Sequence, residues 1–474
     1  MTVMALIAWL LIIGFIVLRH FSISRTTLFA FDWYSLMLVY LFTSYVFPVL
    51  AIFVGIDMPL GSYVHDHPGA ANSALGGTLL LVFGFGSWTG YTLTRGPGLH
   101  SLNDVQVDRR LLVGLIAIIA ASTAAWIIGF GGFVQAITNV MMIRFGTVTS
   151  DSSVPWFMGL TKAAWFSSVI ALDAMIRSKS MPDGSRTRLL AWVLLTVSAL
   201  ALILVGSRGA IGNVLLSMLL YVFARRSFVS PAHEAHEPRK RGATLITIVA
   251  TAVAIVVLFK PAMTLITVAS TDYTLAEAVD NFRLDVRTGT STEGGSLSVF
   301  GKVASEFSHF PIMSTLAFED DQRQPQLRDY GGDLFIAVAK LLPASIYEPP
   351  GVPLSYRSTQ LILGTWESQV PPGIIAWLLF TGGPLCLLYG SVLCGVFLAA
   401  AERAAVSVLG RTWWRESGYI AFGVTVGAGI IGGAPGDLVR ELGTMTAVLV
   451  VAVTVGTMFR LLPQRQLRAS VVTQ

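Results

Sequence analysis

The sequence predicts an all-α protein, a polytopic transmembrane helix bundle of about 11 spans with one long external loop that contains short amphipathic helices. Apolar residues make up 54% of the chain and charged residues only 12%, about half the charged fraction of a soluble domain. The charges collect in short clusters between uncharged blocks of roughly 17 to 25 residues, the length that crosses about 30 Å of hydrocarbon as helix. A β-barrel would instead show alternating segments of about ten residues.

The apolar blocks predict the spans 2–18, 31–56, 73–94, 111–130, 156–176, 189–206, 210–224, 243–259, 372–400, 418–432 and 444–459. Gly382, Gly383 and Pro384 interrupt the ninth block, so a break is expected there, and the glycines of the tenth weaken its helix propensity. Three regions follow. Residues 1–259 hold the first eight spans, 260–371 form an external loop domain, and 372–474 hold the last three spans and a cytoplasmic tail.

Lysine and arginine fall at every second short connection, whereas the intervening short connections are nearly bare of them. This alternation is the positive-inside pattern. It predicts an external N-terminus, a cytoplasmic C-terminus and a periplasmic position for 260–371. The net charge of +5 then serves topology and contact with anionic lipid, and no nucleic-acid partner is expected.

Several motifs are missing from the sequence: a P-loop, HExxH, a CxxC cluster and Gly-x-Ser-x-Gly. Their absence argues against an ATP-driven pump, a metal site and a ready-made serine hydrolase, and no cofactor or metal is expected. Cys386 and Cys394 both lie in the ninth block and give no disulfide framework. His65 and His67 form an HxH pair on an external loop, interpreted as solvated because no third ligand is evident.

Ionisable residues near the hydrocarbon are costly, so each is a functional hypothesis. Asp32 and Asp173 lie near inner span ends, where we expect them to face the adjacent basic connections. Lys162 lies about two turns inside the fifth span, and two readings stay open for it: function, or snorkelling outward. Arg208 occupies the tight GSRG turn between the sixth and seventh spans. Its planar fork at headgroup depth suits a pyrophosphate, with snorkelling from the hairpin tip as the alternative.

The order of these features resembles the O-antigen polymerase family. The resemblance rests on the apolar bundle, the GSRG turn at 206–209, the long outer loop, and the stretch 330–397, which contains YGGDLFIAVAK, LLPASIYEPPG and PPGIIAWLLFTGG. It covers the architecture of most of the chain, whereas its local motifs cover a small part. Members of the family often carry an acidic residue after Pro-Pro, where this chain has apolar residues around Trp377. A catalytic acid would therefore have to be replaced here by Glu367 or Glu348.

The resemblance implies a metal-independent glycosyltransferase in the bacterial inner membrane. Such a polymerase moves a growing glycan from undecaprenyl pyrophosphate onto a new lipid-linked repeat unit at the periplasmic face, without a nucleotide. The implied partners are the lipid-linked donor and acceptor, membrane lipid, a chain-length regulator and a flippase. Two alternatives stay open. A flippase or transporter predicts paired broken helices, whereas one broken block is evident here, and an O-antigen ligase is kept open by His309.

The transfer needs cations for the leaving pyrophosphate, a general base, and aromatic surface for sugars. Besides Arg208, the cation candidates are Arg144, Arg283, Arg287 and Arg357, with salt bridges to Asp280 or Asp285 as the alternative for the middle pair. The base candidates are Glu306 with His309 in an amphipathic segment, followed by Asp333 and Glu367. Tyr330 is the aromatic candidate, in a group with Tyr347, Tyr356 and Trp366 for which interfacial anchoring is the alternative.

The topology can be tested by reporter fusion. Because the basic clusters alternate, a reporter fused after Gly294 should be active only outside the cytoplasm, and one fused after Ala235 only inside. Activity is measured with a paired alkaline phosphatase and fluorescent protein reporter. The opposite result at either site would overturn the external placement of 260–371.

Overall fold

The computed structural model describes residues 14, 32–56, 63–71, 74–95, 106–133, 135–136, 160–178, 181, 184–205, 208–226, 304, 307–339, 353–364, 370–410 and 412–472. Within these ranges all regular structure is helical, as predicted. Five described helices are long and apolar enough to cross a membrane: Trp33–Phe53, Arg109–Gly129, Gly184–Leu202, Ile374–Leu409 and Pro435–Met458. A shorter apolar helix covers Ala210–Val222.

The apolar helices follow one another in an order that matches the predicted blocks. They are α2, η1 and α3 (Trp33–Leu41, Phe42–Val46 and Phe47–Phe53), α6 (Ala74–Thr94), α7 (Arg109–Gly129), α10 (Ala164–Arg177), α11 (Gly184–Val205), α12 (Arg208–Arg226), α19 (Ile374–Leu409), α20 (Arg415–Gly432) and α21 (Pro435–Val472). The predicted spans 2–18, apart from Gly14, and 243–259 lie outside the described residues. The number of spans therefore stays a prediction.

Local chemistry sets several helix ends. Asp32 caps α2, because its carboxylate accepts the backbone N–H of Ser35 at 2.9 Å, one of the donors that a helix start leaves unpaired. Helix α21 begins at Pro435, not at residue 444 as predicted. Proline suits a first helical position, and Asp437 in the first turn favours the positive end of the helix dipole. This earlier start adds two turns to the last span.

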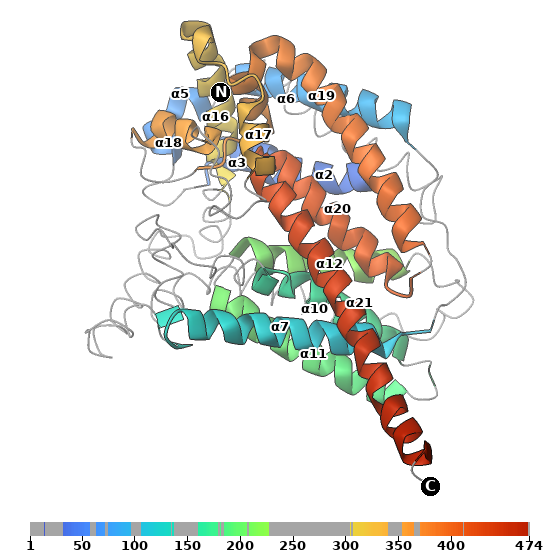
Figure 1. The fold of residues 1–474 in the computed structure, drawn as a ribbon. Coiled ribbons are helices and arrows are strands. Elements are labelled where there is room, and N and C mark those ends of the chain that lie inside the picture. Colours follow the sequence, from blue (N-terminus) through green and yellow to red (C-terminus); the bar gives the residue numbers. More distant parts are fainter. Residues whose placement is uncertain are drawn as a thin grey trace.

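Helix α19 is broken at Gly382 (φ −161°, ψ 20°) and Gly383 (φ 70°, ψ −160°), which confirms the predicted break. A Cβ added at Gly390 would lie 2.5 Å from the side chain of Leu378. In a straight helix these two residues would be about 18 Å apart along the axis, so the two halves bend sharply toward each other (Figure 1). The predicted single span 372–400 is thus a short buried helix followed by a second helix long enough to cross the bilayer alone.

Helices of the predicted external loop gather at one end of the bundle, and the C-terminus of α21 lies at the opposite end (Figure 1). They are α16 (His309–Arg323), η4 (Pro325–Leu327), α17 (Gly332–Ala339) and α18 (Leu354–Leu363), with α4 (Tyr63–Asp66) and α5 (Pro68–Ala71) beside them. The backbone N–H groups of Asp329 and Tyr330 donate to the carbonyls of Phe380 and Thr381, both at 2.9 Å. Since a helix end leaves its last carbonyls unpaired, this outer segment caps the first half of α19.

An ion pair lies directly over the break. Arg328 binds Asp321 through Nε to Oδ1 at 2.7 Å and through Nη2 to Oδ2 at 3.0 Å, the parallel geometry that makes such pairs strong. The hydrogen bond to Asp321 raises the pKa of Arg328 above its ordinary value. A Cβ at Gly383 would lie 2.6 Å from Nη2 of Arg328. Glycine is therefore required at this position for close approach as well as for its positive φ.

Two apolar cores hold the bundle together. The first lies among α2, α6, α19 and α20 and includes residues of α16 and α18. The second lies among α7, α10, α11 and α21. Helix α12 contributes Tyr221 to the first core and Ala210 to the second. The first part of α12, near Ala210, therefore packs in the second core beside α10.

Gly383→Ala should destabilise the protein by about 1–3 kcal/mol, because the left-handed backbone would carry a side chain and the Arg328–Asp321 pair would have to move. The measurement is the thermal denaturation midpoint of the purified full-length protein in detergent. Gly84→Ala is the matched control, since a Cβ there meets nothing within 4 Å. An equal effect of both substitutions would contradict the assigned role of the break.

Candidate functional site

A recess lies where the beginnings of α10, α12 and α21 meet. It is lined by Lys162, Ala163, Trp165, Ala210, Arg440, Glu441, Thr444 and Met445. Trp165 and Met445 are 3% and 1% exposed and give it an apolar floor. On the predicted topology these three helix beginnings are external ends. The recess would then open at the outer membrane surface.

Helix α21 supplies half of the lining from one face. Arg440, Glu441, Thr444 and Met445 follow the spacing that places side chains together on a helix surface. Arg440 is exposed and pairs with Asp437 at 2.5 Å, and the Thr444 hydroxyl donates to the Arg440 carbonyl at 2.7 Å. The start of α21 also contacts the outer segment. A Cβ at Gly436 would lie 3.5 Å from Ala337 of α17, so α17 adjoins this end of the helix.

Two residues singled out from the sequence belong to this end of the bundle. Lys162 lines the recess. Arg208 is the first residue of α12; its side chain lies outside the described part, but Ala210, two residues further on, lines the recess. Helix α2 approaches the same part of α12, because the Tyr40 hydroxyl donates to Oδ1 of Asn213 at 2.7 Å. Lys162 and the start of α12 thus adjoin one recess, although they are far apart in sequence.

The recess combines opposite charges with an apolar floor. Lys162 and Arg440 supply cations, and Glu441 supplies a half-buried carboxylate that interacts electrostatically with Lys162. The indole of Trp165 is buried in the floor. Cations in a partly apolar site bind phosphate oxygens, and a carboxylate can accept a proton. These are two of the three requirements that the predicted transfer reaction places on its site.

Arg357 and Asp333 make contacts within the protein that join the outer helices to the first half of α19. The Arg357 guanidinium donates to Asp320 and lies 4.7 Å from the centre of the Phe380 ring. Asp333 accepts the Leu354 N–H at 3.1 Å and the Trp377 indole N–H at 2.9 Å. Both residues therefore tie the outer helices to the first half of α19. Their substrate-binding roles stay predictions.

His309 begins α16 and is 8% exposed. Its ring packs against Phe310 and Tyr63, with ring centres 4.0 Å and 5.8 Å away. Tyr330 is 75% exposed and has a positive φ of 49°, so its side chain is accessible at the outer end of the bundle. The other candidates lie outside the described residues: Glu306, Arg144, Arg283, Arg287 and Glu367.

Sequence reasoning missed Arg440 and Glu441. A last span at 444–459 leaves both residues in the preceding connection. A signal was present, because Pro435 followed by Asp437 is typical of a helix start. A start at Pro435 puts Glu441 in the second turn of a membrane helix, where an ionisable residue becomes a functional hypothesis.

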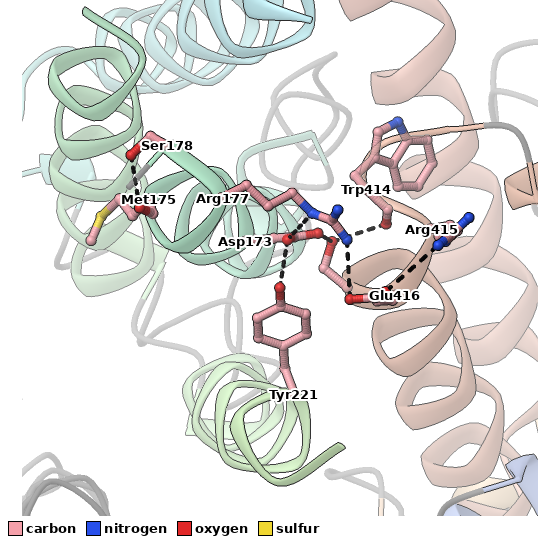
Figure 2. A network of polar contacts seen from close by, with 9 residues as sticks. Asp173, Met175, Arg177, Ser178, Tyr221, Trp414, Arg415 and Glu416 are labelled. Carbon is pink, nitrogen blue, oxygen red and sulfur yellow. Dashed lines mark hydrogen bonds and ion pairs between the residues drawn. The ribbon is translucent and has the colours of Figure 1, made fainter. Parts of the chain in front are cut away.

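A second polar cluster lies at the opposite ends of α10 and α12 (Figure 2). Asp173 is fully buried and accepts hydrogen bonds from Tyr221, from Ser417 and from Nε of Arg177, the last at 2.7 Å. Arg177 also reaches Glu416 at 3.0 Å. This confirms the expected pairing of Asp173 with the basic residues that follow the fifth span. The cluster joins α10, α12 and α20.

Asp32 is also paired as expected, with Arg95 at 3.5 Å. Near this end of α6, the buried carboxylate of Glu402 accepts hydrogen bonds from the hydroxyls of Tyr91 and Tyr419. These contacts tie α6, α19 and α20 together. Asp32, Arg95 and Glu402 are therefore interpreted as parts of the helix packing.

Comparison with family models, with curated proteins and with solved structures found no match for this chain. Among the described residues no group of three or more histidine, cysteine, aspartate or glutamate side chains could hold a metal ion.

Arg177→Met should destabilise the protein by about 3–5 kcal/mol, since it leaves Asp173 and Glu416 without their shared cation in a buried setting. The thermal midpoint of the detergent-purified protein measures this. Arg110→Met is the control, because the Arg110 side chain is 41% exposed and lies 3.7 Å from Asp108. A midpoint unchanged by Arg177→Met would show that the cluster does not hold the helices together.

Proposed function

We propose that the protein is a metal-independent glycosyltransferase that joins undecaprenyl-pyrophosphate-linked repeat units into a polysaccharide at the periplasmic face of the bacterial inner membrane. The observation that carries this proposal is the recess at the beginnings of α10, α12 and α21, with Lys162 and Arg440 in its lining and Arg208 at the start of α12. Lys162 and Arg440 line the recess at the predicted outer surface, and Arg208 lies two residues before Ala210, which also lines it.

The chemistry of the donor explains why such a site is needed. When the glycan leaves its carrier, negative charge develops on the departing pyrophosphate, and preorganised cations in a site with little water stabilise that charge best. Arginine adds a planar fork that binds two phosphate oxygens at once. The floor of the recess is apolar, with Trp165 and Met445 buried in it.

The outer helices supply surface for the glycan. Asp333 and Arg357 fasten α17 and α18 to α19, and Ala337 brings α17 against the start of α21. Tyr330, exposed at the end of this segment, offers a ring with a polar edge. A glycan extending outward from a pyrophosphate in the recess would therefore meet α17 first.

The alternatives differ in what they demand of the site. A transporter predicts paired broken helices in corresponding halves of the chain, whereas the described residues contain one glycine-proline break, in α19. An O-antigen ligase uses the same donor and the same leaving group, so the recess suits it as well. Its product separates the two, because a ligase places the glycan on lipid A core and a polymerase keeps it on the lipid carrier.

Arg208→Ala should lower polymer formation by about 10²-fold or more, since the cation that faces the leaving pyrophosphate is lost. Arg208→Lys should restore little, because an ammonium lacks the fork. The measurement is the ladder of lipid-linked products in a strain whose only copy is the variant. Arg323→Ala is the control, an outer arginine whose side chain is 77% exposed.

Single repeat units that accumulate on the outer face while polymer is lost support a polymerase. Accumulation of the carrier at the cytoplasmic face would instead indicate a flippase, and polymer that persists on its carrier without transfer to lipid A core would indicate a ligase. Full polymer in Arg208→Ala would remove Arg208 from the site.

A further inference from the structure

We propose that Glu441 is the proton acceptor of the reaction, a catalytic residue in the same recess as the cations that bind the pyrophosphate. This inference rests on the proposed function. It moves the base from Glu306, which the sequence favoured, to a membrane helix. The geometry behind it is the joint lining of the recess by Lys162, Arg440 and Glu441.

The setting of Glu441 differs from that of a structural ion pair. The side chains of Asp173 and Arg177 are buried, with exposed fractions of 0% and 6%. Asp173 also accepts hydrogen bonds from Tyr221 and Ser417. Glu441 is half-buried and faces a recess. Thr444, its neighbour in the lining, donates its hydroxyl proton to the Arg440 carbonyl. A carboxylate placed in this way can meet a ligand that enters.

The charged and titratable groups around Glu441 come from three elements. Lys162 precedes α10, Arg440 and Asp437 share α21 with Glu441, and Tyr40 of α2 lies near enough for its phenol to feel the charge of Glu441. Arg440 is already paired with Asp437. Lys162 is thus the cation within the lining that a phosphate and Glu441 would share.

The reaction step is balanced without a cofactor. The acceptor hydroxyl oxygen forms a bond to the anomeric carbon of the donor sugar, and the bond from that carbon to the phosphate oxygen breaks. The electron pair of the broken bond leaves with the pyrophosphate, beside Lys162 and Arg440. The hydroxyl proton moves to the Glu441 carboxylate and is later released to water or to the departing pyrophosphate.

The outer-loop alternative has less support among the described residues. His309, the proposed partner of Glu306, is buried and its ring packs against Tyr63 and Phe310. Glu306 itself lies outside the described residues. The two carboxylates can therefore be compared directly by the same isosteric substitution.

The experiment uses the full-length protein with Glu441→Gln, Glu441→Asp, Glu306→Gln and Lys162→Ala, and with Glu319→Gln as the control carboxylate, 49% exposed in α16. Polymer formation is measured from the lipid-linked ladder in cells. Binding is measured with undecaprenyl pyrophosphate as the probe and the purified protein in nanodiscs. Glu441→Gln should lower polymer formation by about 10²–10⁴-fold while the probe still binds. Glu441→Asp should retain part of the activity, and Lys162→Ala should weaken binding.

The outcomes separate the two proposals. If Glu441→Gln forms polymer at the wild-type level, Glu441 is not the proton acceptor, whatever the activity of Glu306→Gln. The proposed function is not affected by that result. Loss of both polymer and probe binding in Glu441→Gln overturns the assignment of Glu441 too, because the residue would then only build the recess. If deleting the gene leaves the lipid-linked ladder unchanged, the proposed function itself fails, whatever the probe does.

Discussion

The break in α19 is the constraint on which the outer half of the structure depends. The first half of α19 ends at the break and leaves carbonyls that need donors from elsewhere in the protein. The N–H groups of Asp329 and Tyr330 supply two such donors. Above them, the ion pair of Arg328 with Asp321 lies against Gly383, close enough that any side chain there would collide with it. Backbone hydrogen bonds therefore bind the outer segment to the membrane helices, in addition to apolar contacts.

This attachment also defines the surroundings of the recess. Once residues 328–330 are fixed at the break, α17 follows directly and its Ala337 lies against Gly436 at the start of α21. From the other side, the cluster around Asp173 ties α10 and α12 to α20. The opposite ends of α10 and α12 line the recess. Attachment at both ends holds the walls of the recess in place, and the proposed transfer would use such fixed walls to position its reacting groups.

Hydropathy and glycine placement predicted the helical class and the break at Gly382 and Gly383, and the nearby basic residues predicted ion pairs for Asp32 and Asp173. They could not predict that Leu378 packs on Gly390, because that contact depends on how sharply two helices bend. Nor could they bring Lys162 together with Glu441, which line one recess only in the folded protein. Asp333 shows the converse limit. The sequence offers it as a base candidate of the long loop, and in the structure its carboxylate accepts hydrogen bonds from Leu354 and Trp377, partners that no sequence spacing reveals.

The two ends of α10 carry the same chemistry in opposite settings. A buried ion pair is tolerated when every charge is hydrogen-bonded, because desolvation otherwise outweighs the attraction between the charges. Asp173 meets that condition with three donors, and a ligand has no room to enter. Lys162 and Glu441 instead line a recess and interact electrostatically. The buried pair stabilises one arrangement of helices, whereas in the proposed function the pair at the recess would also contact the phosphate and the hydroxyl of its substrates.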